Sequence, residues 1–147
     1  MSPSRSHEVI ERTISILINA YCRHYSLLYF ALDSTTLKNP ETVGKEADTS
    51  YTFGADKDIP DLAVEVIVSS GSTADLVKYQ YLRVSEFWFW QNEEIKFYQL
   101  VDSEYIKVET SSCLPNLSAK FLIEFINRGL TESPLTIEAD FIAQLSS

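Results

Sequence analysis

The sequence has few residues of the kinds that break or cross-link regular structure. Its 147 residues include only four glycines, five prolines and two cysteines, Cys22 and Cys113. So little glycine and proline argues against a disordered or low-complexity chain. The two cysteines show no spacing typical of a metal site or a disulfide framework. We therefore interpret them as reduced residues that serve packing.

Long apolar runs are also missing. No stretch reaches the ~18 consecutive apolar residues of a membrane helix, and the start MSPSRSHEVIER lacks the apolar core of a signal peptide. We therefore expect a cytoplasmic protein without a membrane partner. Hydrophobic residues nevertheless make up 45% of the chain, with eight Tyr, eight Phe and two Trp. That content and the length suit a single domain over residues 1–147.

Basic residues are scarce. The chain has 12 Lys and Arg against 21 Asp and Glu, which gives a net charge of −9. A protein that binds nucleic acid through its overall field needs clustered Lys and Arg. The charge therefore weighs against tight DNA binding. A catalytic carboxylate site remains compatible with it if a divalent metal and a local basic strip connect the protein to phosphate.

Hydrophobic periodicity predicts an α+β fold with a single mixed β-sheet flanked by helices. Apolar residues at helical spacing predict a first helix over residues 7–25, with Ser6 as its N-cap. The predicted strands are 27–32, 50–54, 61–68, 86–91, 95–101 and 105–110. Further helices are expected over 69–83, 119–128 after Ser118, and 135–145 after Ser133-Pro134. The strand 61–68 is apolar on both faces, which is typical of a central strand.

Glu65 is the least expected residue of that strand. Ionised carboxylates are almost never fully buried unless they are paired or bound to a cation. Glu65 is therefore either a metal ligand, a salt-bridge partner or a solvated residue on an edge strand. Asp61 shares its strand face, but four residues of strand rise span roughly 13 Å. That distance is too long for a shared ion, so Asp61 more simply caps the start of the strand.

Two other acids lie on the preceding segment. Asp48, or alternatively Glu46, could stand opposite Glu65 on a neighbouring strand. A cation held by Asp48 and Glu65 would suit phosphodiester hydrolysis, because a metal polarises a phosphoryl oxygen and lowers the pKa of a bound water. A nearby lysine would orient that water and balance the developing charge.

Five segments of the chain are each weakly specific taken alone, but their combination in this order is specific. They read KEADTSYTFG, IPDLAVEVIVSSG, EFWFW, IKFYQL and CLPNLS. Over roughly residues 1–130 the chain thus resembles the Uma-type restriction endonuclease family of the PD-(D/E)xK nuclease superfamily. The resemblance implies a restriction-endonuclease-like fold, DNA as substrate, and a Mg²⁺ or Mn²⁺ site. It places the family's first acid on Asp48 and its second on Glu65.

The expected lysine departs from the family pattern. Ile67 stands where the superfamily has a lysine two residues after the glutamate, and the Uma-type pattern places this lysine on the following helix. There it falls on Asp75. Lys78 lies three residues later on the same helix face, where side chains are neighbours. Lys78 is thus either the catalytic lysine at a shifted position on the helix or a solvated surface residue beside an inactive site.

The start of the chain departs from the family pattern in two further ways. Ala47 replaces the proline that precedes the first acid, a mild change because proline fixes backbone only. The opening MSPSRSHE resembles an internal family segment, so the chain is expected to be N-terminally short relative to the family. His7 and Glu11 are most simply solvated residues near the helix start, where the helix dipole favours an acid such as Glu11. Glu11 could alternatively approach the metal as an accessory acid.

Three functional hypotheses follow. The first is a metal-dependent endonuclease that hydrolyses DNA, with Asp48 and Glu65 binding the cation and Lys78 assisting. The second is a catalytically inactive relative that acts as a binding or dimerisation module, which Asp75 and the short start favour. The third is an acidic α+β protein without a nucleic-acid role.

The aromatic residues of the predicted hairpin allow two interpretations. They could stack on bases, but cross-strand core pairs are the commoner use of such residues. The outer face of this hairpin would suit a homodimer. The residues concerned are Phe87, Trp88, Phe89, Trp90, Phe97 and Tyr98.

Overall fold

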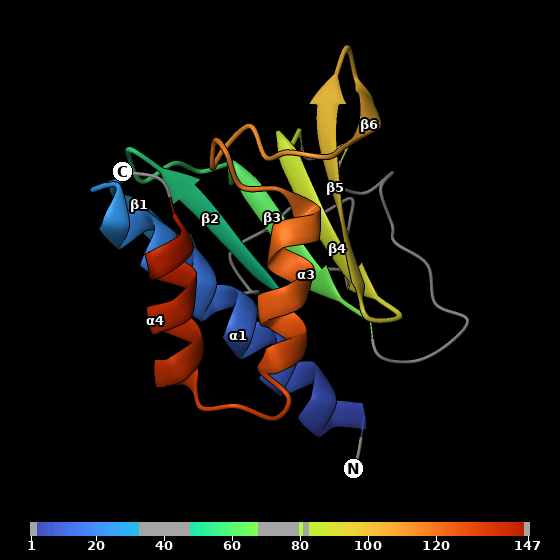
Figure 1. Cartoon of the computed structure of the whole chain (residues 1–147). Helices are drawn as coiled ribbons and strands as arrows, with labels where there is room; N and C mark the ends of the chain where they lie inside the picture. The colour runs from blue at the N-terminus through green and yellow to red at the C-terminus, as the bar shows by residue number, and fades with distance from the viewer. Residues whose placement is uncertain (1–2, 33–47, 68–79, 81–82, 146–147) are drawn as a thin grey trace.

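The computed structural model describes residues 3–32, 48–67, 80 and 83–145. Within these residues the chain forms one six-stranded sheet and three helices (Figure 1). The elements in chain order are α1 (Pro3–His24), β1 (Tyr29–Leu32), β2 (Thr49–Phe53), β3 (Leu62–Val66), β4 (Glu86–Gln91), β5 (Glu94–Val101), β6 (Glu104–Val108), α3 (Ala119–Arg128) and α4 (Pro134–Gln144). The predicted α+β class with a single mixed sheet is confirmed.

The strands lie side by side in sequence order, from β1 to β6. Every neighbouring pair is antiparallel except β3 and β4, which run parallel. This pairing places β3 inside the sheet, so the alternative of Glu65 on an edge strand is wrong. Leu62 and Val66 point into the main core while Ala63 belongs to a smaller cluster on the other face. The predicted central strand with apolar residues on both faces is therefore confirmed.

The three helices lie together on one side of the sheet (Figure 1). The apolar stripe of α1 packs there with α3, α4 and one face of the central strands. Trp88 of β4 and Phe97 of β5 stack in this core with ring centroids 4.5 Å apart, and neither ring is exposed. Rings so completely buried cannot stack on bases, so for this pair the interpretation as cross-strand core residues is confirmed. None of the described helices is both long and apolar enough to span a membrane.

Helix boundaries follow the capping residues, with one exception. Ser118 is the N-cap of α3 and accepts a hydrogen bond from Phe121 N at 3.1 Å, and Ser133 is the N-cap of α4 and accepts one from Leu135 N at 3.2 Å. The N-cap predicted at Ser6 is wrong, because α1 already begins at Pro3. Proline suits the first helical turn, since the backbone N–H that it lacks would have no partner there. Apart from Gln80 and Arg83, the helix predicted over residues 69–83 lies outside the described residues.

Both cysteines are unpaired packing residues, as the sequence indicates. Cys22 is buried in the main core, and burial raises the pKa of its thiol to about 11. Burial also raises the pKa of Cys113, and the nearby Glu86 carboxylate adds to this effect. Neither thiol therefore has the thiolate character of a reactive cysteine.

Glu86 is a fully buried carboxylate at the start of β4. Its Oε2 accepts hydrogen bonds from Trp88 Nε1 and Ser111 Oγ, both at 2.6 Å. Its Oε1 accepts from the backbone N–H groups of Ser112 at 2.8 Å and Cys113 at 3.0 Å. Four donors compensate the loss of hydration that a buried carboxylate would otherwise suffer. Glu86 thereby fixes the segment before α3 to the start of β4.

Gly129 marks the place where the end of α3 meets α1. Its φ is −61°, so the left-handed conformation common after a helix does not explain the glycine. A Cβ at this position would instead collide with the side chain of Thr13 on α1. The absence of a side chain therefore allows the close approach of the two helices.

We predict that Glu86→Ala lowers the free energy of unfolding by about 3 kcal/mol or more, because it leaves several buried donors without an acceptor. Urea denaturation measures this loss. Glu94→Ala, at an exposed glutamate of β5, should change stability by less than about 0.5 kcal/mol. Equal effects of the two substitutions would contradict the assigned role of Glu86.

We also predict that Gly129→Ala destabilises the fold by about 1–3 kcal/mol through overpacking against Thr13. Thr13→Ala removes the colliding atoms, so the double variant should be more stable than the sum of the two single effects implies. A double-mutant cycle by urea denaturation tests this. Simple additivity would show that the two residues do not collide.

Candidate metal centre

Asp48 stands at the point where β2 begins. The last paired residues of the β2–β3 ladder are Thr49 and Val64, so Asp48 lies one step further, beside Glu65. The Oδ2 atom of Asp48 accepts a hydrogen bond of 2.6 Å from the backbone N–H of Val66. The carboxylate thus continues the ladder in place of a backbone carbonyl. This bond orients the carboxylate at the end of two adjacent strands.

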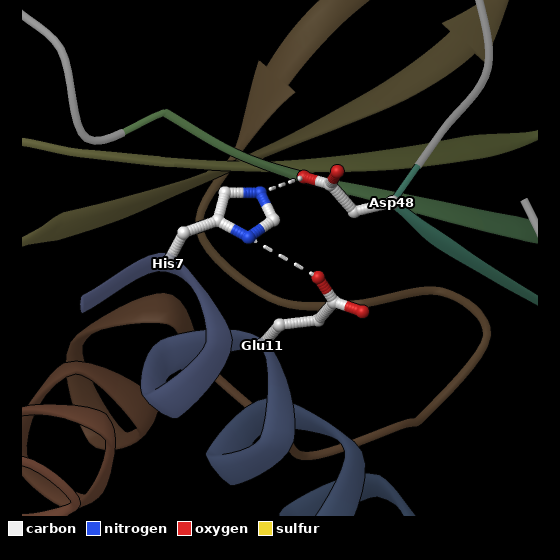
Figure 2. A group of neighbouring side chains, drawn as sticks. All are labelled: His7, Glu11 and Asp48. Atoms are coloured by element: carbon white, nitrogen blue, oxygen red, sulfur yellow. Dashed lines mark ion pairs between the residues drawn. The ribbon is translucent and has the colours of Figure 1, made fainter. Parts of the chain in front are cut away.

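Helix α1 brings two further side chains to Asp48 (Figure 2). His7 Nε2 lies 3.1 Å from Asp48 Oδ2, and His7 Nδ1 lies 3.4 Å from Glu11 Oε2. His7 and Glu11 share a helix face because they are four residues apart. The three side chains are 28%, 31% and 24% exposed for His7, Glu11 and Asp48. This partial burial leaves the cluster open to a small ligand.

The packing of α1 against β2 explains why these residues meet. One turn beyond Glu11, the hydroxyls of Ser15 and Tyr51 are hydrogen-bonded at 3.0 Å. Tyr51 belongs to β2 and is buried in the main core with the apolar stripe of α1. This contact fixes the position of α1 along β2, and the N-terminal turns of the helix then lie beside Asp48.

Like charges face each other in the cluster. The pKa of Glu11 is raised, first by burial and next by the negative charge of Asp48. His7 and Arg12 act in the opposite direction, but the upward effects exceed theirs. Two carboxylates held this close favour a cation between them.

The donor atoms of the cluster suit a metal ion. One atom each from His7, Glu11 and Asp48 can be chosen so that all lie within 4.8 Å of one another. An imidazole nitrogen and two carboxylate oxygens are common metal ligands, bound at about 2.0–2.2 Å. The arrangement could therefore hold one divalent cation.

Of the other candidate residues from the sequence, the structure describes two, Glu65 and Asp61. Glu65 is half-buried next to Asp48 in the register but is not part of the three-residue cluster. Asp61 accepts hydrogen bonds from Phe53 N and Lys57 Nζ, both at 2.8 Å, at the opposite end of β3. Its expected capping role is confirmed. Three further candidates, Glu46, Asp75 and Lys78, lie outside the described residues.

The interpretation of His7 and Glu11 as merely solvated residues at a helix start is wrong. Because α1 begins at Pro3, both residues lie beyond its first turn, where the helix dipole has little effect. The spacing of four residues was the signal that these two side chains act together. Only the fold could add that Asp48, far away in sequence, faces them.

A mixed sheet with an acidic residue at the end of an internal strand pair, covered by helices, defines an α+β fold of the restriction-endonuclease-like class. The chain belongs to the Uma2 family, whose model, described as "Putative restriction endonuclease", matches residues 1–126. A comparison with curated proteins gives no significant match. The resemblance noted in the sequence is thereby confirmed.

We predict that Asp48→Ala exposes the Val66 amide, because the substitution removes its acceptor. Amide hydrogen exchange at Val66 should accelerate by about tenfold or more, while Ala63 in the middle of β3 changes little. Glu11→Gln should leave Val66 protected, because Glu11 forms no bond to this amide. An unchanged exchange rate in Asp48→Ala would show that Asp48 does not cap β3.

Proposed function

We propose that the chain is a metal-dependent endonuclease that hydrolyses DNA phosphodiester bonds. In this proposal Asp48 and Glu65 hold a divalent cation, Mg²⁺ or Mn²⁺, at the end of the β2–β3 pair. The position of Asp48 carries the proposal, because it lies beside Glu65 in the register and its carboxylate is oriented by Val66 N. Membership of a restriction endonuclease family supports DNA as the substrate.

The chemistry of the two acids fits a divalent cation. Carboxylate oxygens are ligands that suit Mg²⁺ and Mn²⁺. The Val66 N–H already holds the Asp48 carboxylate in place, so this ligand needs little ordering when an ion binds.

In this proposal each residue of the site has a separate role in hydrolysis. A bound cation would polarise a phosphoryl oxygen and activate a water molecule for attack. Asp48 keeps its orientation through Val66, so it presents the same oxygen to the site in every turnover. Lys78, outside the described residues, is proposed to orient the attacking water and to balance the charge that develops on phosphate.

A second candidate function is a catalytically inactive relative that serves as a binding or dimerisation module. Asp75 at the family's lysine position favours it, since a carboxylate cannot supply the positive charge of lysine. The net charge of −9 favours it too, because it opposes approach to a polyanion. A homodimer would suit either function, because two copies match the symmetry of duplex DNA.

We predict that the wild-type protein nicks or linearises plasmid DNA with Mg²⁺ or Mn²⁺, and that EDTA abolishes the activity. Asp48→Asn, Glu65→Ala and Lys78→Ala should each lower the single-turnover rate by about 100-fold or more. The matched controls are Glu94→Ala and Lys120→Ala, at exposed positions away from the site. Both controls should cleave like the wild type.

Each outcome discriminates between the two functions. Cleavage that survives Glu65→Ala unchanged would rule out the proposed mechanism. If Lys78→Ala still cleaves while the other two variants do not, Lys78 has no part in the mechanism. Metal binding without any cleavage by the wild type would favour the inactive relative.

A further inference from the structure

The three-residue cluster differs in chemistry from a pair of acids. Two of its three donors come from α1, and one of these is the imidazole of His7. Mg²⁺ binds through oxygen atoms and retains several waters. Imidazole nitrogen is a typical ligand of first-row transition metals. The presence of the His7 imidazole among the donors therefore bears directly on which metal the site selects.

The distances fit ligands of one ion. Neighbouring ligands of an ion bound at about 2.0–2.2 Å lie roughly 3.0–3.5 Å apart. His7 Nε2 and Asp48 Oδ2 are 3.1 Å apart, so these two atoms already have that separation. Glu11 must rotate away from Nδ1, because one imidazole gives one nitrogen to an ion. Its carboxylate oxygen starts within 4.8 Å of a His7 nitrogen and of an Asp48 oxygen.

The charges of the cluster point in the same direction. A single imidazole stands between two carboxylates, with Nε2 3.1 Å from Asp48 Oδ2 and Nδ1 3.4 Å from Glu11 Oε2 (Figure 2). An ordinary surface ion pair joins one cation to one anion, whereas this cluster has an excess of negative charge that a divalent cation would neutralise.

We propose that His7 and Glu11 are metal ligands together with Asp48, so that the site binds a first-row transition metal such as Mn²⁺ in preference to Mg²⁺. This inference deepens the proposed function, because it concerns the cation that Asp48 is proposed to hold. It assigns to α1 a direct part in metal choice. The remaining coordination positions stay open to water, Glu65 and phosphate oxygens.

Mn²⁺ binding to the full chain tests the inference without any measurement of activity. Electron spin echo spectroscopy of bound Mn²⁺ should show modulation from a coordinated nitrogen, and His7→Ala should abolish it. Calorimetric titrations should show Mn²⁺ binding at least about tenfold tighter than Mg²⁺. His7→Ala should weaken Mn²⁺ binding by about tenfold or more and change Mg²⁺ binding much less.

The chain offers matched controls for both side chains. His24, the second of its two histidines, lies in the last turn of α1, and His24→Ala should keep both the nitrogen signal and the affinity. Glu11→Gln should weaken Mn²⁺ binding, whereas Glu94→Gln, at an exposed glutamate of β5, should not. Circular dichroism of each variant confirms that it is folded.

The results separate this inference from the proposed function. The inference would be overturned if Mn²⁺ does not bind, if the nitrogen signal is missing, or if His7→Ala and His24→Ala have equal effects. In any of these cases, Mg²⁺-dependent cleavage by His7→Ala would still support the nuclease. A nitrogen signal that depends on His7 in a protein that never cleaves DNA would uphold the metal site and overturn the nuclease.

Discussion

The parallel pairing of β3 with β4 is the constraint on which both ends of the central sheet depend. It places β3 inside the sheet, and a carboxylate stands at each end of the pair. At one end Glu86 accepts four hydrogen bonds and fixes the segment before α3. At the other end Asp48 caps Val66. One carboxylate serves stability, and the other also faces the candidate metal centre.

Helix α1 connects the core to that centre. Its apolar stripe fills the space between the sheet, α3 and α4. The close contact of Thr13 with Gly129 and the bond between Ser15 and Tyr51 fix the helix in place. His7 and Glu11 extend from the same rigid helix toward Asp48. Donors held by packed elements need little reorganisation to bind an ion, which favours a defined geometry over a mobile acidic patch.

Much of the fold could be predicted from sequence because local signals agree with it. Alternation in 61–68 indicated the central strand, and the serines before α3 and α4 indicated their N-caps. The role of Glu86 could not be predicted, since its donors around Ser111 come close only through sheet register. The candidate site could be derived from the sequence only in part. Strand rise excluded Asp61 and left Asp48, but the approach of His7 to Asp48 depends on how α1 packs.

The central claim is that a divalent cation binds at Asp48. Anomalous diffraction from crystals soaked in Mn²⁺ tests it most directly. The account predicts a peak about 2.0–2.3 Å from a carboxylate oxygen of Asp48, with His7 Nε2 at a similar distance. A peak bound only elsewhere on the acidic surface, or no peak at Asp48 in Mn²⁺-saturated crystals, would contradict it.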